Sequence, residues 1–235
     1  MREQLIKTTD VQQLINHCKH NLDLMNTKLS DEFFYASLPF CVIDAVFSVG
    51  VRYESTRRVV MRFCDHFHLQ RIHNDSISTL ELSITGFLEM YDKCSPQCMA
   101  DNIYQNKQRT SSRNGILKAE ATLRVAQTLK NAGVEFKADV FKTDDRANFE
   151  AEFKEIPGQG SGKSLHYFYM LAGSDDDVAL NNMVLRFIAS AIGREPTLDE
   201  GYQLLADTCK ELKQQYRDLT LRKLDHSIWN FQREQ

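Results

Sequence analysis

Residues 40–51 (FCVIDAVFSVGV) place the tightest limit on the fold, because they are apolar in nearly every direction. A helix that is apolar all round must be covered on several sides, so this segment predicts the central helix of a core. Other segments repeat apolar residues every three or four positions, and alternating runs of Val, Ile and Thr are almost absent. The 235 residues contain only four prolines. The sequence therefore predicts an all-α protein of about ten helices.

Composition narrows the class of protein further. With 42% hydrophobic residues the chain can bury a sizeable core. No run is long and apolar enough for a membrane span, and the N-terminus does not look like a signal peptide, so we expect a cytoplasmic protein without membrane contact. The six scattered cysteines are expected to be reduced core residues.

Charge is unevenly distributed along the chain. The net charge of −3 argues against a protein that coats nucleic acid. Residues 104–130 nevertheless carry six basic residues against one acidic residue, which predicts a local basic surface.

Polar residues dominate 83–114, which we interpret as an irregular insertion. Cys94 and Cys98 could join His66 and His68 in a zinc site, but their spacing is not diagnostic, so we expect neither a metal nor a cofactor.

Residues 155–165 (EIPGQGSGKSL) lie between two helical patterns and carry the most specific motif. Pro157 ends the first helix, and Gly158 and Gly160 permit positive φ and close approach of the backbone. The second helix starts with unsatisfied amides, so the motif predicts a phosphate site. A plain turn is the alternative. A nucleotide-binding P-loop is excluded, because no strand precedes the motif and its glycine spacing is wrong.

This motif resembles the hairpin of the helix-hairpin-helix DNA glycosylases, the endonuclease III superfamily, in which backbone amides grip one DNA strand. Three more segments resemble the family in the same order: 40–53, the Lys-Ala helix start at 115–120 (GILKAE) and the helix start at 180–187 (LNNMVLRF). The resemblance covers roughly residues 36–193, and several ordered matches carry more weight than any one of them.

The resemblance implies a two-lobed all-α helix-hairpin-helix glycosylase fold. One lobe would be 36–174, with the hairpin motif at about 144–173, and the other would combine 1–35 with 175–235. The partner would be double-stranded DNA bound in a cleft by a monomer. The implied activity is to flip a damaged or modified base from the duplex and hydrolyse its N-glycosidic bond. Some bacterial relatives look like phage-defence enzymes, which adds bases such as glucosylated hydroxymethylcytosine as substrates.

The implied DNA contacts come from three places in the chain. Family members insert a side chain into the gap left by the flipped base from the region after the long apolar helix, which nominates Arg52 and Tyr53 as wedge candidates. The remaining contacts belong to the hairpin and the basic stretch. The full set is Gly158, Gly160, Gly162, Lys163, Ser164, Arg52, Tyr53, Arg113 and Lys118.

Two departures from the family concern catalysis. Asn181 occupies the position of the catalytic aspartate when Arg186 is aligned, and an amide supplies no charge to an oxocarbenium-like sugar. Gly162 takes the place of the nucleophilic lysine of bifunctional members. Lys163 follows one residue later, turned by ~100°, so we expect it to contact phosphate rather than form a Schiff base. The family's iron–sulfur cluster is absent, because only Cys209 lies in that region.

Asn181 leaves three explanations open: a natural loss of catalysis, a deliberate Asp-to-Asn change, or another acid. The candidate acids are Asp44, Glu120 and residues 175–177. The three aspartates at 175–177 also suit a solvated loop before a helix. Asp44 interrupts an apolar helix, and a buried carboxylate must be paired or have a raised pKa. A catalytically inert DNA-binding module and a protein-interaction domain remain alternatives to the glycosylase.

Overall fold

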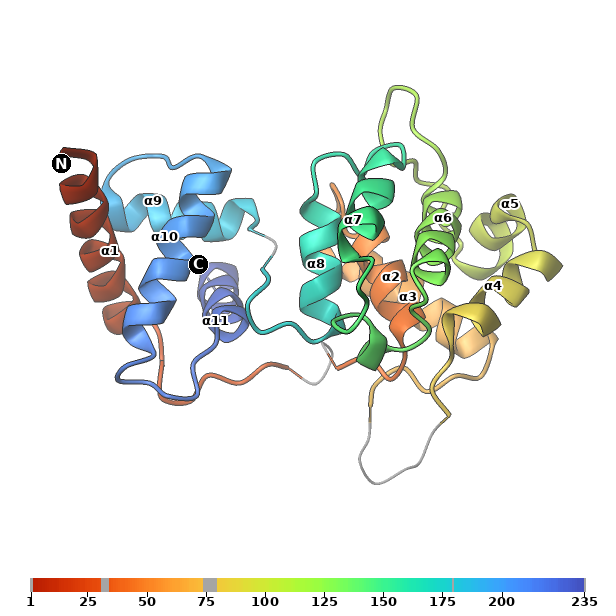
Figure 1. Cartoon of the computed structure of the whole chain (residues 1–235), viewed down its shortest axis with the longest axis horizontal. Coiled ribbons are helices and arrows are strands. Elements are labelled where there is room, and N and C mark those ends of the chain that lie inside the picture. Colours follow the sequence, from red (N-terminus) through yellow and green to blue (C-terminus); the bar gives the residue numbers. More distant parts are fainter. Residues whose placement is uncertain (1, 31–33, 74–79, 179, 235) are drawn as a thin grey trace. The chain divides into compact units, whose positions relative to one another are not determined.

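The computed structural model describes residues 2–30, 34–73, 80–178 and 180–234. Within these ranges the chain is all-α, as the sequence predicts, and β-pairing is limited to the isolated bridges Tyr35–Ile72 and Arg109–Leu117. It divides into two compact units (Figure 1). We call Asp31–Gly173 the central unit, and Met1–Ser30 with Ser174–Gln235 the terminal unit.

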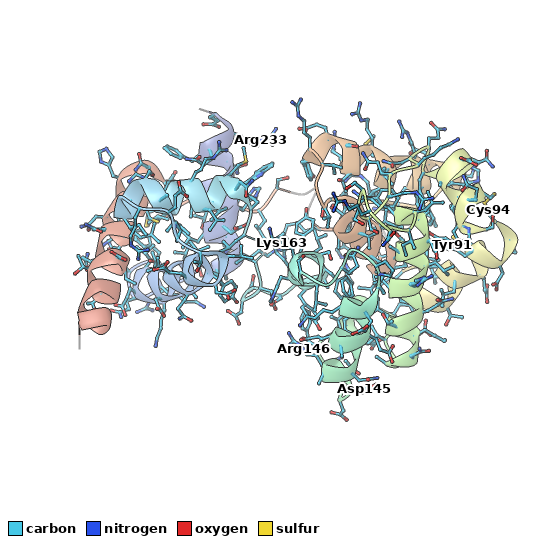
Figure 2. All side chains as sticks on the ribbon, turned by 90° about the horizontal axis from the view of Figure 1, so that it is seen from above. Tyr91, Cys94, Asp145, Arg146, Lys163 and Arg233 are labelled. Atoms are coloured by element: carbon cyan, nitrogen blue, oxygen red, sulfur yellow. A yellow bond between two sulfur atoms is a disulfide. The ribbon has the colours of Figure 1, made fainter. Side chains whose placement is uncertain are left out.

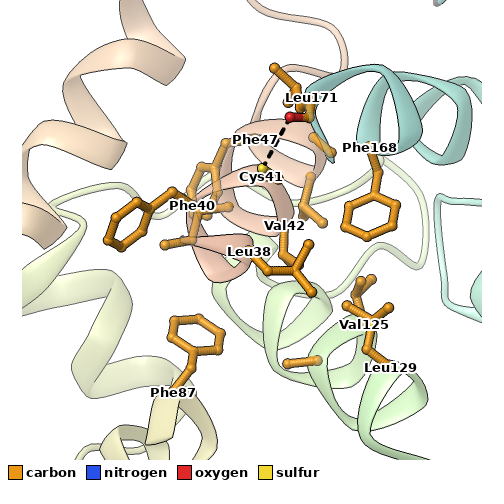
Figure 3. Close-up of a cluster of buried hydrophobic side chains, with 14 of the residues drawn as sticks. Leu38, Phe40, Cys41, Val42, Phe47, Phe87, Val125, Leu129, Phe168 and Leu171 are labelled. Carbon is orange, nitrogen blue, oxygen red and sulfur yellow. Dashed lines mark hydrogen bonds between the residues drawn. The ribbon is translucent and has the colours of Figure 1, made fainter. Parts of the chain in front are cut away.

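The apolar segment at 40–51 forms the middle of the central unit. Its helix, α2 (Leu38–Phe47), packs against α3 (Tyr53–His66), α6 (Lys118–Asn131) and α8 (Lys163–Ala172). All ten residues of α2 are buried, and the Cys41 thiol donates to the carbonyl of Leu171 over 3.4 Å (Figure 3). The helix ends at Phe47, four residues earlier than the apolar run, and Gly50 in the following turn has a φ of +73°.

The expected irregular insertion at 83–114 is mostly helical, so that prediction was wrong. Its helices are α4 (Ile84–Lys93), α5 (Pro96–Cys98) and a π-helical turn, Met99–Ile103. Ser83 caps α4 by accepting from the Gly86 amide, and Ile84, Phe87 and Tyr91 form one buried stripe. The polar residues that obscured this stripe, such as Glu89 and Asp92, are exposed. Residues 104–117 do form a loop, which projects beside α6 in Figure 1.

Cys94 and Cys98 are joined by a disulfide at the junction of α4 and α5 (Figure 2), which corrects the expectation of six reduced cysteines. It also removes both sulfurs from the zinc site considered for them. The other four described cysteines, Cys18, Cys41, Cys64 and Cys209, form no disulfide and are buried, as expected.

The terminal unit is built from helices at both ends of the chain. They are α1 (Arg2–Asn21), α9 (Asn182–Ile192), α10 (Leu198–Leu212) and α11 (Leu221–Arg233). Thr197 and Thr220 cap α10 and α11 through their hydroxyls. Leu14, Phe187 and Leu205 lie in the unit's own core. Among the described residues, no helix combines the length and apolarity that a bilayer crossing needs.

Candidate functional site

The glycine motif joins two helices of the central unit, α7 (Arg146–Glu155) and α8, through a tight turn. Phe149 and Phe153 anchor α7 in the core. Gly158 has a φ of +87°, and a Cβ built on it would lie 2.5 Å from the Cβ of Thr110. Gly162, with a φ of +71°, is the N-cap residue of α8. Glycine is therefore required at position 158, because the backbone has a positive φ there and because Thr110 leaves no space for a Cβ.

The turn keeps several amides free. Gly158, Gly160 and Ser161 are exposed, and their N–H groups donate no hydrogen bond to any described residue. Gly162 and Ser164 differ, which corrects their assignment as DNA contacts. The Gly162 amide donates to the Gln159 carbonyl over 3.0 Å, and the buried Ser164 hydroxyl donates to the Gln159 side chain. These two residues hold the turn together instead.

Lys163 is exposed at the first position of α8, beside these amides (Figure 2). The loop that contacts Gly158 supplies a second cation, because Arg113 is exposed at its tip. Arg109 and Thr110 close this loop: the Arg109 guanidinium donates to the Gly115 carbonyl over 2.6 Å, and the Thr110 amide donates to the Ile116 carbonyl over 2.9 Å.

The other basic residues of 104–130 do not form an open patch. Lys107 pairs with Asp101, Arg124 with Glu120 and Lys130 with Glu135. Each pair is partly exposed, so it offsets charge while adding little stability. Arg113 makes no side-chain hydrogen bond or ion pair with any described residue. Of the basic residues in this stretch, Arg113 is therefore the one whose side chain is exposed without a hydrogen-bond or ion-pair partner among the described residues, and the positive surface near the glycine turn is smaller than the sequence suggests.

Lys118 is only 2% exposed, which corrects its assignment as a DNA contact. Its ammonium donates to the carbonyls of Phe47 and Val49 over 2.9 and 2.8 Å, and to the Gln108 side chain over 3.3 Å. Burial lowers the pKa of Lys118 to about 8. The cation satisfies carbonyls at the C-terminal end of α2, where positive charge is favourable. It also links the α2–α3 turn to the loop at 104–117.

We expect Lys118→Met to lower the free energy of unfolding by about 2 kcal/mol at neutral pH, because buried carbonyls lose a charged donor. Urea denaturation of the full chain measures this loss. Lys93→Met, at an exposed position of α4, is the matched control and should change stability by less than about 0.5 kcal/mol. Equal stability of Lys118→Met and wild type would show that the ammonium contributes nothing to the fold.

The turn after α2 carries the two wedge candidates. Arg52 is exposed at the N-cap of α3. Tyr53 begins the helix and is partly exposed, but its hydroxyl is buried. The geometry therefore keeps Arg52 as a wedge candidate, whereas the polar end of Tyr53 points inward.

Asp44 is buried, with 1% of the residue exposed, and the Tyr35 hydroxyl donates to it over 2.8 Å. A buried carboxylate needs either a partner or a raised pKa, and Tyr35 is such a partner. Burial raises the pKa of Tyr35 well above its usual range, and Asp44 raises it further, so Tyr35 remains a hydrogen-bond donor.

Asn181 lies in the terminal unit as the N-cap residue of α9. Its side-chain oxygen accepts from the amides of Met183 and Val184 over 2.8 and 3.2 Å. Arg186, one turn further on, is exposed and lines a shallow hollow with Ser190 and Arg194. Asn181 is itself exposed, so its capping role leaves it at the surface.

Among the other acids considered as substitutes, Glu120 and Asp177 have local side-chain partners. Glu120 pairs with Arg124 over 2.6 Å. Ser174 donates to Asp177 over 2.8 Å, and Asp175 and Asp176 are exposed in the same loop. No three His, Cys, Asp or Glu residues in the described ranges gather closely enough to hold a metal ion.

Comparison with known proteins places the chain in a family. A family model described as a domain of unknown function, DUF8548, matches residues 12–233. The chain belongs to this family. No curated protein and no solved structure matches it. The match to DUF8548 covers residues of both structural units, so the glycine turn and Asn181 lie within the same family domain.

Proposed function

We propose that this DUF8548 member binds duplex DNA through the turn between α7 and α8. The observation that carries the proposal is the set of exposed, free amides at Gly158, Gly160 and Ser161. Such amides bind phosphate oxygens without reading sequence. Lys163 and Arg113 add charge beside them, and two cations on a net-acidic chain suit a contact with a short length of one strand.

We further propose that the bound protein extrudes a modified base and that the reaction is hydrolysis of the N-glycosidic bond. Support comes from the likeness of the glycine turn and the start of α9 to helix-hairpin-helix glycosylases. The proposed fold is the two-lobed fold of that superfamily, and the proposed substrates include damaged bases and modified bases such as glucosylated hydroxymethylcytosine. A base that pairs poorly costs the least to extrude.

One observation favours a second function, DNA binding without catalysis. In the likeness to helix-hairpin-helix glycosylases, Asn181 takes the position of their catalytic carboxylate; it is neutral and uses its side-chain oxygen to cap α9. Aspartate caps helices as well as asparagine does, so Asn181→Asp restores a charge without disturbing the helix start.

The test combines binding with base release. We expect wild type to bind a short duplex in fluorescence anisotropy, and Lys163→Glu with Arg113→Glu to weaken binding by tenfold or more. Lys142→Glu, an exposed lysine outside the turn, is the control for net charge. Wild type and Asn181→Asp are then incubated with duplexes carrying candidate bases, and alkali-labile sites are counted.

Each outcome decides between the functions. Base release by either protein supports the glycosylase, and binding without release by both supports the inert module. Failure of wild type to bind at low salt, or equal binding by the charge-reversal variant, contradicts the proposed DNA site and leaves the protein-interaction domain.

A further inference from the structure

Helix α3 carries two arginines one turn apart on a face that points away from the core. Arg58 and Arg62 are separated by four residues, so their side chains are neighbours on the helix surface, and we call them the α3 arginine pair. Arg58 is exposed and Arg62 is partly exposed. Another face of α3 is buried in the core through Thr56, Val59, Val60, Phe63 and Cys64. The pair is therefore presented by a helix that the core holds in place.

The protein does not neutralise the charge of this pair. Among the described residues neither arginine forms an ion pair with an acidic side chain, although Asp65 follows Arg62 by only three residues. Other basic residues of the central unit are paired, as in Lys107–Asp101, Arg124–Glu120, Lys130–Glu135 and Arg146–Glu150. A surface that pairs its other cations but leaves two neighbouring arginines without an acid favours an anion from outside the chain.

Backbone carbonyls hold both arginines in place. The Nε of Arg58 donates to the Glu54 carbonyl over 3.2 Å, and the Nη1 of Arg62 donates to the carbonyls of Tyr104 and Gln105 over 3.1 and 3.2 Å. A carbonyl carries no net charge, so each side chain remains a full cation. A guanidinium has five N–H donors, so each keeps donors for a ligand. An arginine already held in position also loses less conformational entropy when it binds.

One loop of the central unit connects the pair with the glycine turn. Tyr104 and Gln105, which accept from Arg62, lie at the start of the loop at 104–117. The same loop places Thr110 against Gly158 and carries the exposed Arg113. The α3 arginine pair and the glycine turn therefore belong to one compact unit and share one connecting segment.

The chemistry of the pair favours a phosphate backbone as its ligand. The planar fork of arginine matches phosphate oxygens in a bidentate manner. No large hydrophobic side chain of α3, all of whose residues the structure describes, is exposed. Protein interfaces and membrane-bound helices depend on such apolar anchors, whereas a nucleic-acid backbone needs only charge and hydrogen-bond donors.

We propose that the α3 arginine pair forms a second phosphate contact, to the same duplex that the glycine turn binds. This inference rests on the proposed DNA-binding function and adds a second surface to it. Each arginine neutralises one phosphate. Together they raise the affinity for every sequence alike and make binding more sensitive to salt.

The test measures how binding depends on salt. Dissociation constants are determined by fluorescence anisotropy over a range of salt concentrations for two unrelated duplexes of ~20 bp. Arg58→Gln and Arg62→Gln each remove one charge, whereas Arg58→Lys keeps it. Arg124→Gln is the matched control, because Arg124 is an exposed arginine of the same unit whose charge Glu120 offsets.

We expect each of the two glutamine variants of the pair to lower the slope of log affinity against log salt by about 0.9. Binding at ~50 mM salt should weaken by about tenfold, equally for both sequences. Arg58→Lys should keep the wild-type slope, and Arg124→Gln should stay within about twofold of the wild-type affinity. Urea denaturation checks folding. Arg58 bonds only within its own helix, so Arg58→Gln keeps the test valid where Arg62→Gln fails to fold.

Unchanged slopes in the folded glutamine variants of the pair overturn the α3 contact, while weaker binding by Lys163→Glu with Arg113→Glu still supports the glycine turn. The reverse pattern supports the α3 contact and contradicts the turn. Absence of wild-type binding to both duplexes overturns both proposals. An equal slope change in Arg124→Gln shows an effect of net charge alone, and an equal change in Arg58→Lys shows an effect other than charge. Either result overturns the inference.

Discussion

Gly158→Ala is expected to lower the free energy of unfolding by about 3 kcal/mol or more. Two effects add at this position. A φ of +87° strains any side chain, and the new Cβ would lie 2.5 Å from the Thr110 Cβ and 2.7 Å from its hydroxyl oxygen. The loop at 104–117 must then move away from the turn. Urea denaturation measures the loss of stability, and anisotropy with a short duplex measures the accompanying loss of binding.

Gly160→Ala is the matched control, two residues along the same turn. Its φ is not positive, and the nearest atom to a new Cβ is the Lys154 carbonyl oxygen at 3.5 Å, an ordinary contact. Its stability should therefore remain within about 1 kcal/mol of wild type. If Gly158→Ala proves as stable as Gly160→Ala, the close contact between Thr110 and the turn is absent in solution.

A helix is easiest to predict where a local stripe and a local stop signal occur together, as in α6. There Ala119, Ala126 and Leu129 follow helical spacing, and Gly133, with a φ of +71°, lies two residues after the last helical residue. The α4 helix was missed because polar residues dilute a narrow stripe. The true end of α2 was missed because an apolar run shows burial and not where a helix ends.

The residues of the candidate site also fall into two groups, those that the local sequence reveals and those that only the packing of distant segments reveals. Pro157 and Gly158 were found because turns depend on the conformations of individual residues. Gly160, expected to permit positive φ, does not adopt it, whereas Gly162 does. The roles of Lys118 and Thr110 depend on distant parts of the chain, and Lys118 bonds to a carbonyl 71 residues away. A lysine in a basic stretch is expected at the surface, and only the packing of α2 against α6 reveals its burial.

Asp225→Asn is expected to raise the free energy of unfolding by roughly 1–3 kcal/mol near pH 8 and to have little effect near pH 4. Asp225 lies in α11, and its Oδ1 is buried without a hydrogen-bond partner among the described residues. Burial raises the pKa of Asp225 from 3.8 to about 7. Between these two values the folded chain holds a proton that the unfolded chain has released. Stability of the wild type therefore falls as the pH rises through this range.

Urea denaturation of both proteins across this pH range measures the effect, and the gap between the two curves should open as the carboxyl ionises. Asp218 is an exposed carboxylate just before the same helix, so Asp218→Asn is the control. Its free energy of unfolding should match that of the wild type across this pH range. An asparagine at 225 still buries an unpaired polar group, so the gain should be smaller than the full cost of burying the charge. A loss of stability near pH 8 in Asp225→Asn would mean that the ionised carboxylate has a partner in the folded chain, and that the α11 site favours charge.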